Sequence, residues 1–151
     1  MDIRIDDLSG IEIAALLEEH LQDMYATSPA ESVHALDLSK LRQPNIIFWT
    51  IWHNGQLAGC GALKQLSSLH AEVKSMRVAH AHRRKGVAAK LLQHMLDFAK
   101  VNGYQQLSLE TGTMAFFEPA RQLYAGFGFT LGENFADYPL DHHSLFMHKY
   151  L

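Results

Sequence analysis

The stretch Arg83-Arg84-Lys85-Gly86-Val87-Ala88 says more about the fold than any other part of this sequence. It lies between a strand-like segment, 71–79, and a long amphipathic segment, 86–102. Three cationic side chains lead into a glycine that opens the expected helix, and a helix N-terminus presents unpaired N–H groups with a partial positive charge. Glycine also lets a ligand approach the backbone closely. The stretch therefore predicts a site for a phosphate-bearing ligand.

The segments on either side of this stretch predict an α+β fold. Residues 71–79, the helix after them and a strand near 107–109 form a strand–helix–strand unit, which predicts a parallel pair with a right-handed crossover. Further strands are expected at 3–5, 46–52, 57–66, from 127, and at 144–150, and further helices at 9–24, 38–42 and 119–125. The prediction is a mixed, mostly antiparallel sheet of six or seven strands flanked by about four helices.

Local signals refine these elements. Ser9 is expected to cap the first long helix. The dipeptide Asn54-Gly55 predicts a tight hairpin turn. Two glycines in the strand after it, Gly59 and Gly61, predict a bulge or a close approach of the backbone.

Composition restricts the class of protein. The 151 residues, 48% hydrophobic and 19% charged, predict a single domain over 1–151. The formal net charge of -3 argues against a nucleic-acid partner. The acidic start lacks an apolar signal core and no segment is long and apolar enough for a bilayer, which predicts a cytoplasmic protein without a membrane partner. Cys60 is the only cysteine and is expected in the core, and the ten histidines are scattered, so no metal site is predicted.

A second motif makes a family resemblance specific. The segment 120–129 reads Ala-Arg-Gln-Leu-Tyr-Ala-Gly-Phe-Gly-Phe, which matches the pattern A-x-x-L-Y-x-x-x-G-F. Residues 83–88 match the pattern Gln/Arg-x-x-Gly-x-Gly/Ala, with Ala88 in the last position. With these two motifs in this order, from about residue 45 to the C-terminus the chain resembles the GNAT superfamily of acetyl-CoA-dependent N-acetyltransferases. It is most similar to small bacterial members.

The resemblance implies acetyl-CoA as cosubstrate and no metal. The backbone N–H groups of 84–89 would hold the pyrophosphate, with the three cationic side chains nearby. The pantetheine arm would pair with the strand that precedes the loop, where family members splay from the next strand. The residues expected to bind the cofactor are Met76, Arg77, Val78, Arg83, Arg84, Lys85, Gly86, Val87, Ala88, Ala89, Arg121 and Tyr124.

The resemblance also implies catalytic groups. Tyr124 matches the family's general acid, and its ordinary pKa of about 10 is close to that of an alkyl thiol. Glu72 and Glu110 are alternative general bases, and each could instead be a strand carboxylate with a structural role. The residues expected to contact the acceptor are His34, Asp37, Glu72, Glu110, Thr111 and Tyr138, with loop capping as the alternative for the first two.

The function implied is transfer of an acetyl group to a primary amine of a small molecule, amino acids being one candidate class, by direct attack in a ternary complex. Two alternatives stay open. One is an acetyl-CoA sensor without turnover, and the other is acetylation of protein lysines or N-termini. A homodimer is compatible with the sequence.

Overall fold

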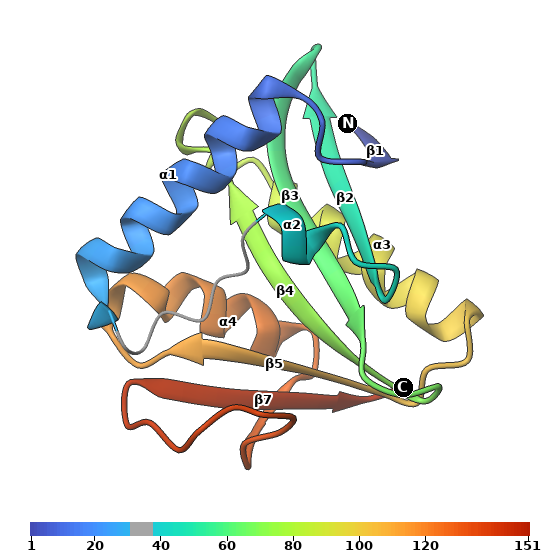
Figure 1. Cartoon of the computed structure of the whole chain (residues 1–151), viewed down its shortest axis with the longest axis vertical. Helices are drawn as coiled ribbons and strands as arrows, with labels where there is room; N and C mark the ends of the chain where they lie inside the picture. The colour runs from blue at the N-terminus through green and yellow to red at the C-terminus, as the bar shows by residue number, and fades with distance from the viewer. Residues whose placement is uncertain (31–37) are drawn as a thin grey trace.

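A computed structural model describes residues 1–30 and 38–151 of the chain. Figure 1 shows its main elements. The helices are α1 (Ile11–Thr27), α2 (Leu38–Leu41), α3 (Val87–Val101) and α4 (Glu118–Gly126). The strands are β1 (Asp2–Ile5), β2 (Ile46–His53), β3 (Gln56–Gln65), β4 (His70–Val78), β5 (Gln106–Gly112), β6 (Thr130–Gly132) and β7 (Ser144–Tyr150). Short 3-10 turns cover His80–His82 and Ala115–Phe117.

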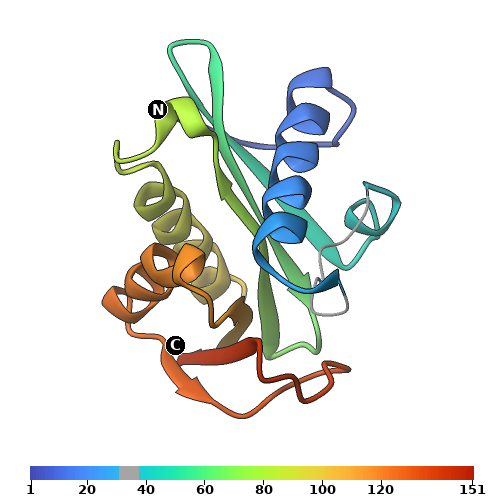
Figure 2. The ribbon, with the colours of Figure 1, turned by 90° about the vertical axis from the view of Figure 1, so that its left-hand side faces the viewer.

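The seven strands form one sheet in the order β1-β2-β3-β4-β5-β7-β6. Only β4 and β5 run parallel, and the other neighbours are antiparallel. The predicted mixed, mostly antiparallel α+β fold is therefore confirmed, and so is the parallel pair that α3 connects. In the side view of Figure 2, α1 lies on one side of the sheet, and α3 and α4 lie on the other.

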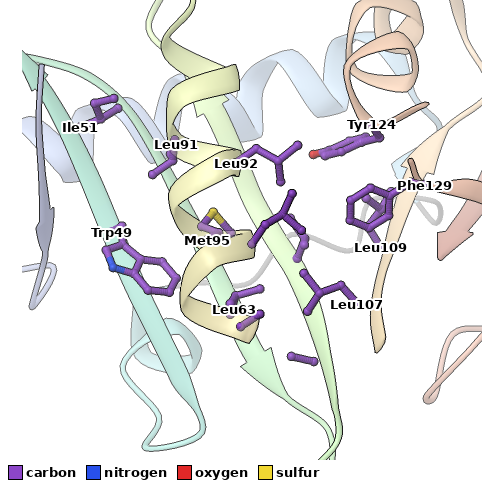
Figure 3. Packing of buried hydrophobic residues seen from close by; sticks show 14 of the residues in the cluster. Trp49, Ile51, Leu63, Leu91, Leu92, Met95, Leu107, Leu109, Tyr124 and Phe129 are labelled. Atoms are coloured by element: carbon purple, nitrogen blue, oxygen red, sulfur yellow. The ribbon is translucent and has the colours of Figure 1, made fainter. Parts of the chain in front are cut away.

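The largest core cluster fills the space between the sheet and α3. Figure 3 shows apolar side chains of α3 between those of β2 on one side and β5 on the other. Leu91, Leu92, Met95 and Ala99 recur at helical spacing and are almost wholly buried, as the apolar stripe predicts. Burying a side chain of this size contributes on the order of 2 kcal/mol, so this face fixes α3 on the sheet.

Two local predictions differ from the structure. Ser9 does not cap α1, since Gly10 occupies the N-cap position and the Ser9 hydroxyl donates to Asp7 Oδ1 at 2.6 Å. The strand expected from residue 127 begins only at Thr130, because the preceding residues close α4: the Phe129 N–H donates to the Tyr124 carbonyl, and Gly128 takes φ of 94°.

The predicted irregularity in the glycine-bearing strand is confirmed as a β-bulge. Gly61 of β3 lies opposite two residues of β4, Ser75 and Met76, and Ser75 has φ of 57°. A Cβ on Gly61 would lie 2.6 Å from the Met76 sulfur, so only glycine leaves this room. The bulge reverses the alternation of side chains, and Lys74 and Arg77 therefore both lie on the face that α1 covers.

Strands β4 and β5 pair only at their beginnings. Their paired residues are His70–Glu72 on β4 and Gln106–Ser108 on β5, whereas both strands continue for several residues beyond. The sheet therefore opens between the ends of β4 and β5, as the family resemblance implies.

Candidate active site

A groove of about 560 Å³ runs from the end of β4 past the start of α3 to α4. Its lining includes most of the residues predicted to bind the cofactor: Met76, Arg77, Val78, Arg83, Arg84, Gly86, Val87, Ala88, Ala89 and Tyr124. The groove thus joins the open edge of β4 to the helix start that the sequence singled out.

The start of α3 is open to a ligand. Gly86 is its N-cap residue, with φ of 76° and no side-chain cap. The first hydrogen bond into the helix is the Lys90 N–H to the Gly86 carbonyl at 3.1 Å, so the preceding N–H groups have no intrahelical acceptor. Apart from its chain neighbours, no described residue has a heavy atom within 4 Å of where a Cβ on Gly86 would stand. These N–H groups and the helix dipole together favour an anion.

Three of the residues predicted to bind the cofactor direct their side chains away from the groove. Lys85 is exposed and does not line the groove. The Arg121 guanidinium also lies outside the groove lining, because it donates to the carbonyls of Gly112 and Met114 at 2.6 and 3.0 Å and ties α4 to the end of β5. Arg77 directs its buried guanidinium toward α1 rather than along the groove.

A second hollow, of about 120 Å³, opens between the diverging ends of β4 and β5. Its lining brings together Glu72, Glu110, Thr111 and Tyr138, the predicted acceptor residues that the structure describes. The other two, His34 and Asp37, lie outside the described residues. The lining holds the Glu72 and Glu110 carboxylates and one ammonium, that of Lys74, so an amine-bearing acceptor would meet a surplus of negative charge.

Glu72 is almost fully buried and is part of a three-residue hydrogen-bond network. The Tyr138 hydroxyl donates to Glu72 Oε2 at 2.5 Å, and the Lys74 ammonium donates to the same oxygen at 3.1 Å and to the Tyr138 hydroxyl at 2.6 Å. Burial, and next the Glu72 carboxylate, raise the pKa of Tyr138. Tyr138 therefore remains a hydrogen-bond donor at neutral pH, and the Lys74 cation compensates the Glu72 charge.

Glu110 reaches the pocket from β5. Its Oε2 accepts a hydrogen bond from the Ser144 hydroxyl of β7 at 2.7 Å. Both Glu72 and Glu110 thus lie in the pocket, and each has a neutral hydroxyl partner. The geometry leaves the general base open between them.

A chain of hydrogen bonds extends across the same face of the sheet. His70 Nε2 and Ser108 Oγ share a hydrogen bond of 2.6 Å, Ser108 Oγ and His148 Nδ1 share one of 2.7 Å, and His148 Nε2 lies 2.7 Å from the Glu133 carbonyl. Burial, and next His148, lower the pKa of His70. These histidines are structural links between β4, β5 and β7.

Tyr124 lies where the groove and the pocket meet, since it lines both. Its ring packs edge-on against Phe129, with centroids 5.7 Å apart. Burial raises the pKa of Tyr124 above its ordinary value, so the hydroxyl stays protonated at neutral pH. The protonated hydroxyl can therefore hydrogen-bond a developing thiolate and pass its proton to it.

The sequence did not assign two side chains of α1, His20 and Met24, to the site. Both lie one turn apart in the apolar stripe of the helix, and both line the pocket. The available signal was a histidine within an otherwise apolar stripe, which is more typical of a packed core position. His143 also lines the pocket, whereas its exposed neighbour His142 does not.

Two groups of side chains have metal-ligand types close together among the described residues. Glu19, Asp23 and His80 form one, and the Arg77 guanidinium already supplies its cation at 2.6 and 2.5 Å from the two carboxylates. The other consists of Asp141, His142 and His143, just before β7, and of these three His142 is exposed. Within 1–30 and 38–151, no helix has the length and apolar character needed to cross a bilayer.

The comparisons with known proteins agree with this geometry. The model of the "Acetyltransferase (GNAT) family" matches residues 13–129. The chain is 56% identical over its full length to YsnE of Bacillus subtilis, named an uncharacterized N-acetyltransferase and also matched in full. It is 36% identical over 92% of its length to the "IAA acetyltransferase" of Azospirillum brasilense, of which it covers 88%.

A crystal structure gives the same result for the fold. A putative acyl-CoA N-acyltransferase from Klebsiella pneumoniae superposes with a TM-score of 0.81 at 28% identity, covering 99% of this chain and 97% of the other. Together with the family match over most of the chain, this makes the protein a member of the GNAT family, whose enzymes are acetyl-CoA-dependent N-acetyltransferases.

Proposed function

We propose that the enzyme acetylates the primary amine of a small molecule by direct attack on acetyl-CoA in a ternary complex. One observation carries the proposal: the groove at the α3 N-terminus and the pocket with Glu72 and Glu110 meet at Tyr124. A thioester lying along the groove would have its carbonyl where an amine held by the carboxylates could reach it.

The pocket supports a small acceptor with a cationic or amine group. Its volume of about 120 Å³ leaves room for an amine-bearing group rather than for a large molecule. Glu72 and Glu110 would bind the ammonium form, and one of them would take its proton before attack. The C–N bond then forms, the C–S bond breaks, and the sulfur takes a proton from the Tyr124 hydroxyl.

Cys60 supports direct attack rather than a covalent acetyl-enzyme. The thiol is fully buried, donates to the Ser75 carbonyl at 3.3 Å, and lies outside the lining of the groove and the pocket. Burial raises the pKa of Cys60 to about 12, so the reactive thiolate is scarce at neutral pH.

An acetyl-transfer screen tests the proposal. The protein is incubated with acetyl-CoA and amino acids, polyamines, aminoglycosides, IAA and lysine-containing peptides. Release of CoA thiol and the mass of the product are followed. Transfer to one small-amine class is expected. Firm binding of acetyl-CoA with no transfer to any acceptor would favour a sensor, and transfer confined to peptides would favour protein acetylation.

Carboxylate variants connect the activity to the pocket. For the acceptor found, Glu72→Gln and Glu110→Gln should each lower kcat/KM by roughly 10–100-fold, because a charged hydrogen-bond partner is lost. Glu12→Gln, on the exposed first turn of α1, is the matched control and should leave kcat/KM unchanged.

A further inference from the structure

His20 occupies the junction between the groove and the pocket. Five residues line both hollows: His20, Met76, Phe117, Ala120 and Tyr124. Only His20 and Tyr124 among them carry a strong hydrogen-bonding side chain. Tyr124 is proposed to protonate the thioester sulfur. His20 is therefore the remaining polar side chain of the five that line both hollows.

Among the described residues, the two pocket carboxylates have hydrogen-bond partners and His20 has none. Glu72 accepts from Tyr138 and Lys74, and Glu110 accepts from Ser144. Within the part of the chain that the structure describes, no hydrogen bond to the His20 imidazole is found. A half-buried imidazole without a partner is free to bond a substrate.

The neighbours of His20 on α1 hold the helix against β4. Glu19 and Asp23, one turn apart on the helix, accept hydrogen bonds from the Arg77 guanidinium at 2.6 and 2.5 Å. Arg77 follows directly on Met76 of β4, in the segment predicted to hold the pantetheine arm. The ion pairs therefore anchor α1 to the cofactor-binding strand, and His20 lies beside this anchor.

The surroundings of His20 keep the imidazole neutral. Burial, and next the Arg77 cation, lower its pKa to about 4, against the opposing effect of the Asp23 and Glu19 carboxylates. A neutral imidazole carries one N–H donor and one nitrogen acceptor, whereas an imidazolium would have two donors and would repel an amine cation. His20 can therefore accept a hydrogen bond at any pH near neutrality.

We propose that His20 accepts a hydrogen bond from an N–H of the attacking amine and so orients the nitrogen lone pair toward the thioester carbonyl carbon. This inference rests on the proposed function. In the transfer step the C–N bond forms, the C–S bond breaks, Tyr124 gives the sulfur its proton, and the surplus proton of the nitrogen passes to a pocket carboxylate. His20 starts and ends the step neutral.

Two variants test this role with the acceptor that the screen identifies. His20→Leu removes the acceptor atom and should lower kcat/KM at least about tenfold, because small errors of alignment are costly in the transfer step. His20→Gln keeps an oxygen acceptor and should retain activity within about threefold of the wild type. Affinity for acetyl-CoA should stay within about threefold in both. His94→Leu, on the exposed side of α3 and outside both hollows, is the matched control.

A second measurement does not depend on turnover. The nitrogen chemical shifts of the His20 imidazole, identified by their loss in His20→Gln, should show a neutral ring at pH 6. Wild-type activity of His20→Leu, failure of His20→Gln to restore what His20→Leu loses, or a protonated ring at pH 7 would each overturn this inference alone. Absence of transfer by the wild type would overturn the proposed function, and the inference with it.

Discussion

At the scale of single residues, Tyr124 combines a packing role with a chemical one. Its ring belongs to the core cluster with Phe129, and its hydroxyl lies at the meeting point of the two hollows. Figure 3 shows the Tyr124 and Phe129 rings next to each other. The packed ring fixes where the hydroxyl can be, so the hydroxyl's contribution can be measured without disturbing the core.

Tyr124→Phe should lower kcat by on the order of 10²-fold, because the thiolate then leaves without a proton donor. Affinity for acetyl-CoA and the melting temperature should change little, since phenylalanine keeps the contact with Phe129. The measurements are steady-state kinetics, cofactor titration and thermal melting. An unchanged kcat together with an unchanged pH–rate profile would remove Tyr124 as the acid.

Gly86 is the residue on which the phosphate assignment depends. Gly86→Asp should weaken acetyl-CoA binding by more than tenfold, because a carboxylate would enter the space where the phosphates are expected and would compete for the same N–H groups. Isothermal titration with acetyl-CoA measures the loss.

The control for Gly86→Asp is Gly103→Asp. Gly103 has φ of 82°, and apart from its chain neighbours no described residue has a heavy atom within 4 Å of where its Cβ would stand, but it follows the other end of α3. It imposes the same left-handed strain, about 1–2 kcal/mol, and should leave acetyl-CoA affinity intact. Equal losses in the two variants would mean that strain, not the ligand, explains the effect.

At the scale of elements, the contact between α1 and β4 unites the two halves of the site. The bulge at Ser75 turns Arg77 toward α1, where it pairs with Glu19 and Asp23. The guanidinium is buried, whereas the two carboxylates are about one-third exposed. This asymmetry makes Arg77 the partner whose removal affects the fold most.

Arg77→Met should destabilise the fold by about 2 kcal/mol, a value reduced from that of a fully buried pair because solvent screens the carboxylates. Arg4→Met is the matched control: its ion pair with Asp2 is equally short, 2.6 Å, but more than half exposed on both sides. It should cost less than about 1 kcal/mol. Urea unfolding compares the two, and equal losses would contradict an anchoring role for Arg77.

Some residues of the candidate site could be predicted from the sequence, and others could not. The two motifs located the start of α3 and Tyr124, because backbone conformation and local spacing determine both. Arg121 was assigned to the cofactor from its place in a motif, yet it binds the carbonyls at the end of β5. His20 was missed because its role comes from α1 lying beside β4, a contact between residues more than fifty positions apart that local periodicity does not encode.

At the scale of the whole molecule, burial of His20 ties stability to pH. Its pKa is about 4 in the folded chain and about 6.5 when unfolded. Between these values the unfolded chain binds the extra proton, so the free energy of unfolding falls as pH decreases from 6.5 toward 4. The contribution is fully present above pH 6.5 and amounts to about 3 kcal/mol.

Lowering the pH from 7 to 5 should therefore cost about 2 kcal/mol through His20 alone, or roughly 4–8 °C in melting temperature for a chain of this size. His20→Leu should remove that part of the pH dependence, whereas the exposed His94→Leu should keep the wild-type slope. Thermal melting of the three proteins at pH 7, 6 and 5 measures it. Parallel curves for His20→Leu and the wild type would mean that the pKa of His20 is the same in the folded and the unfolded chain, so that burial would not be what keeps the imidazole neutral.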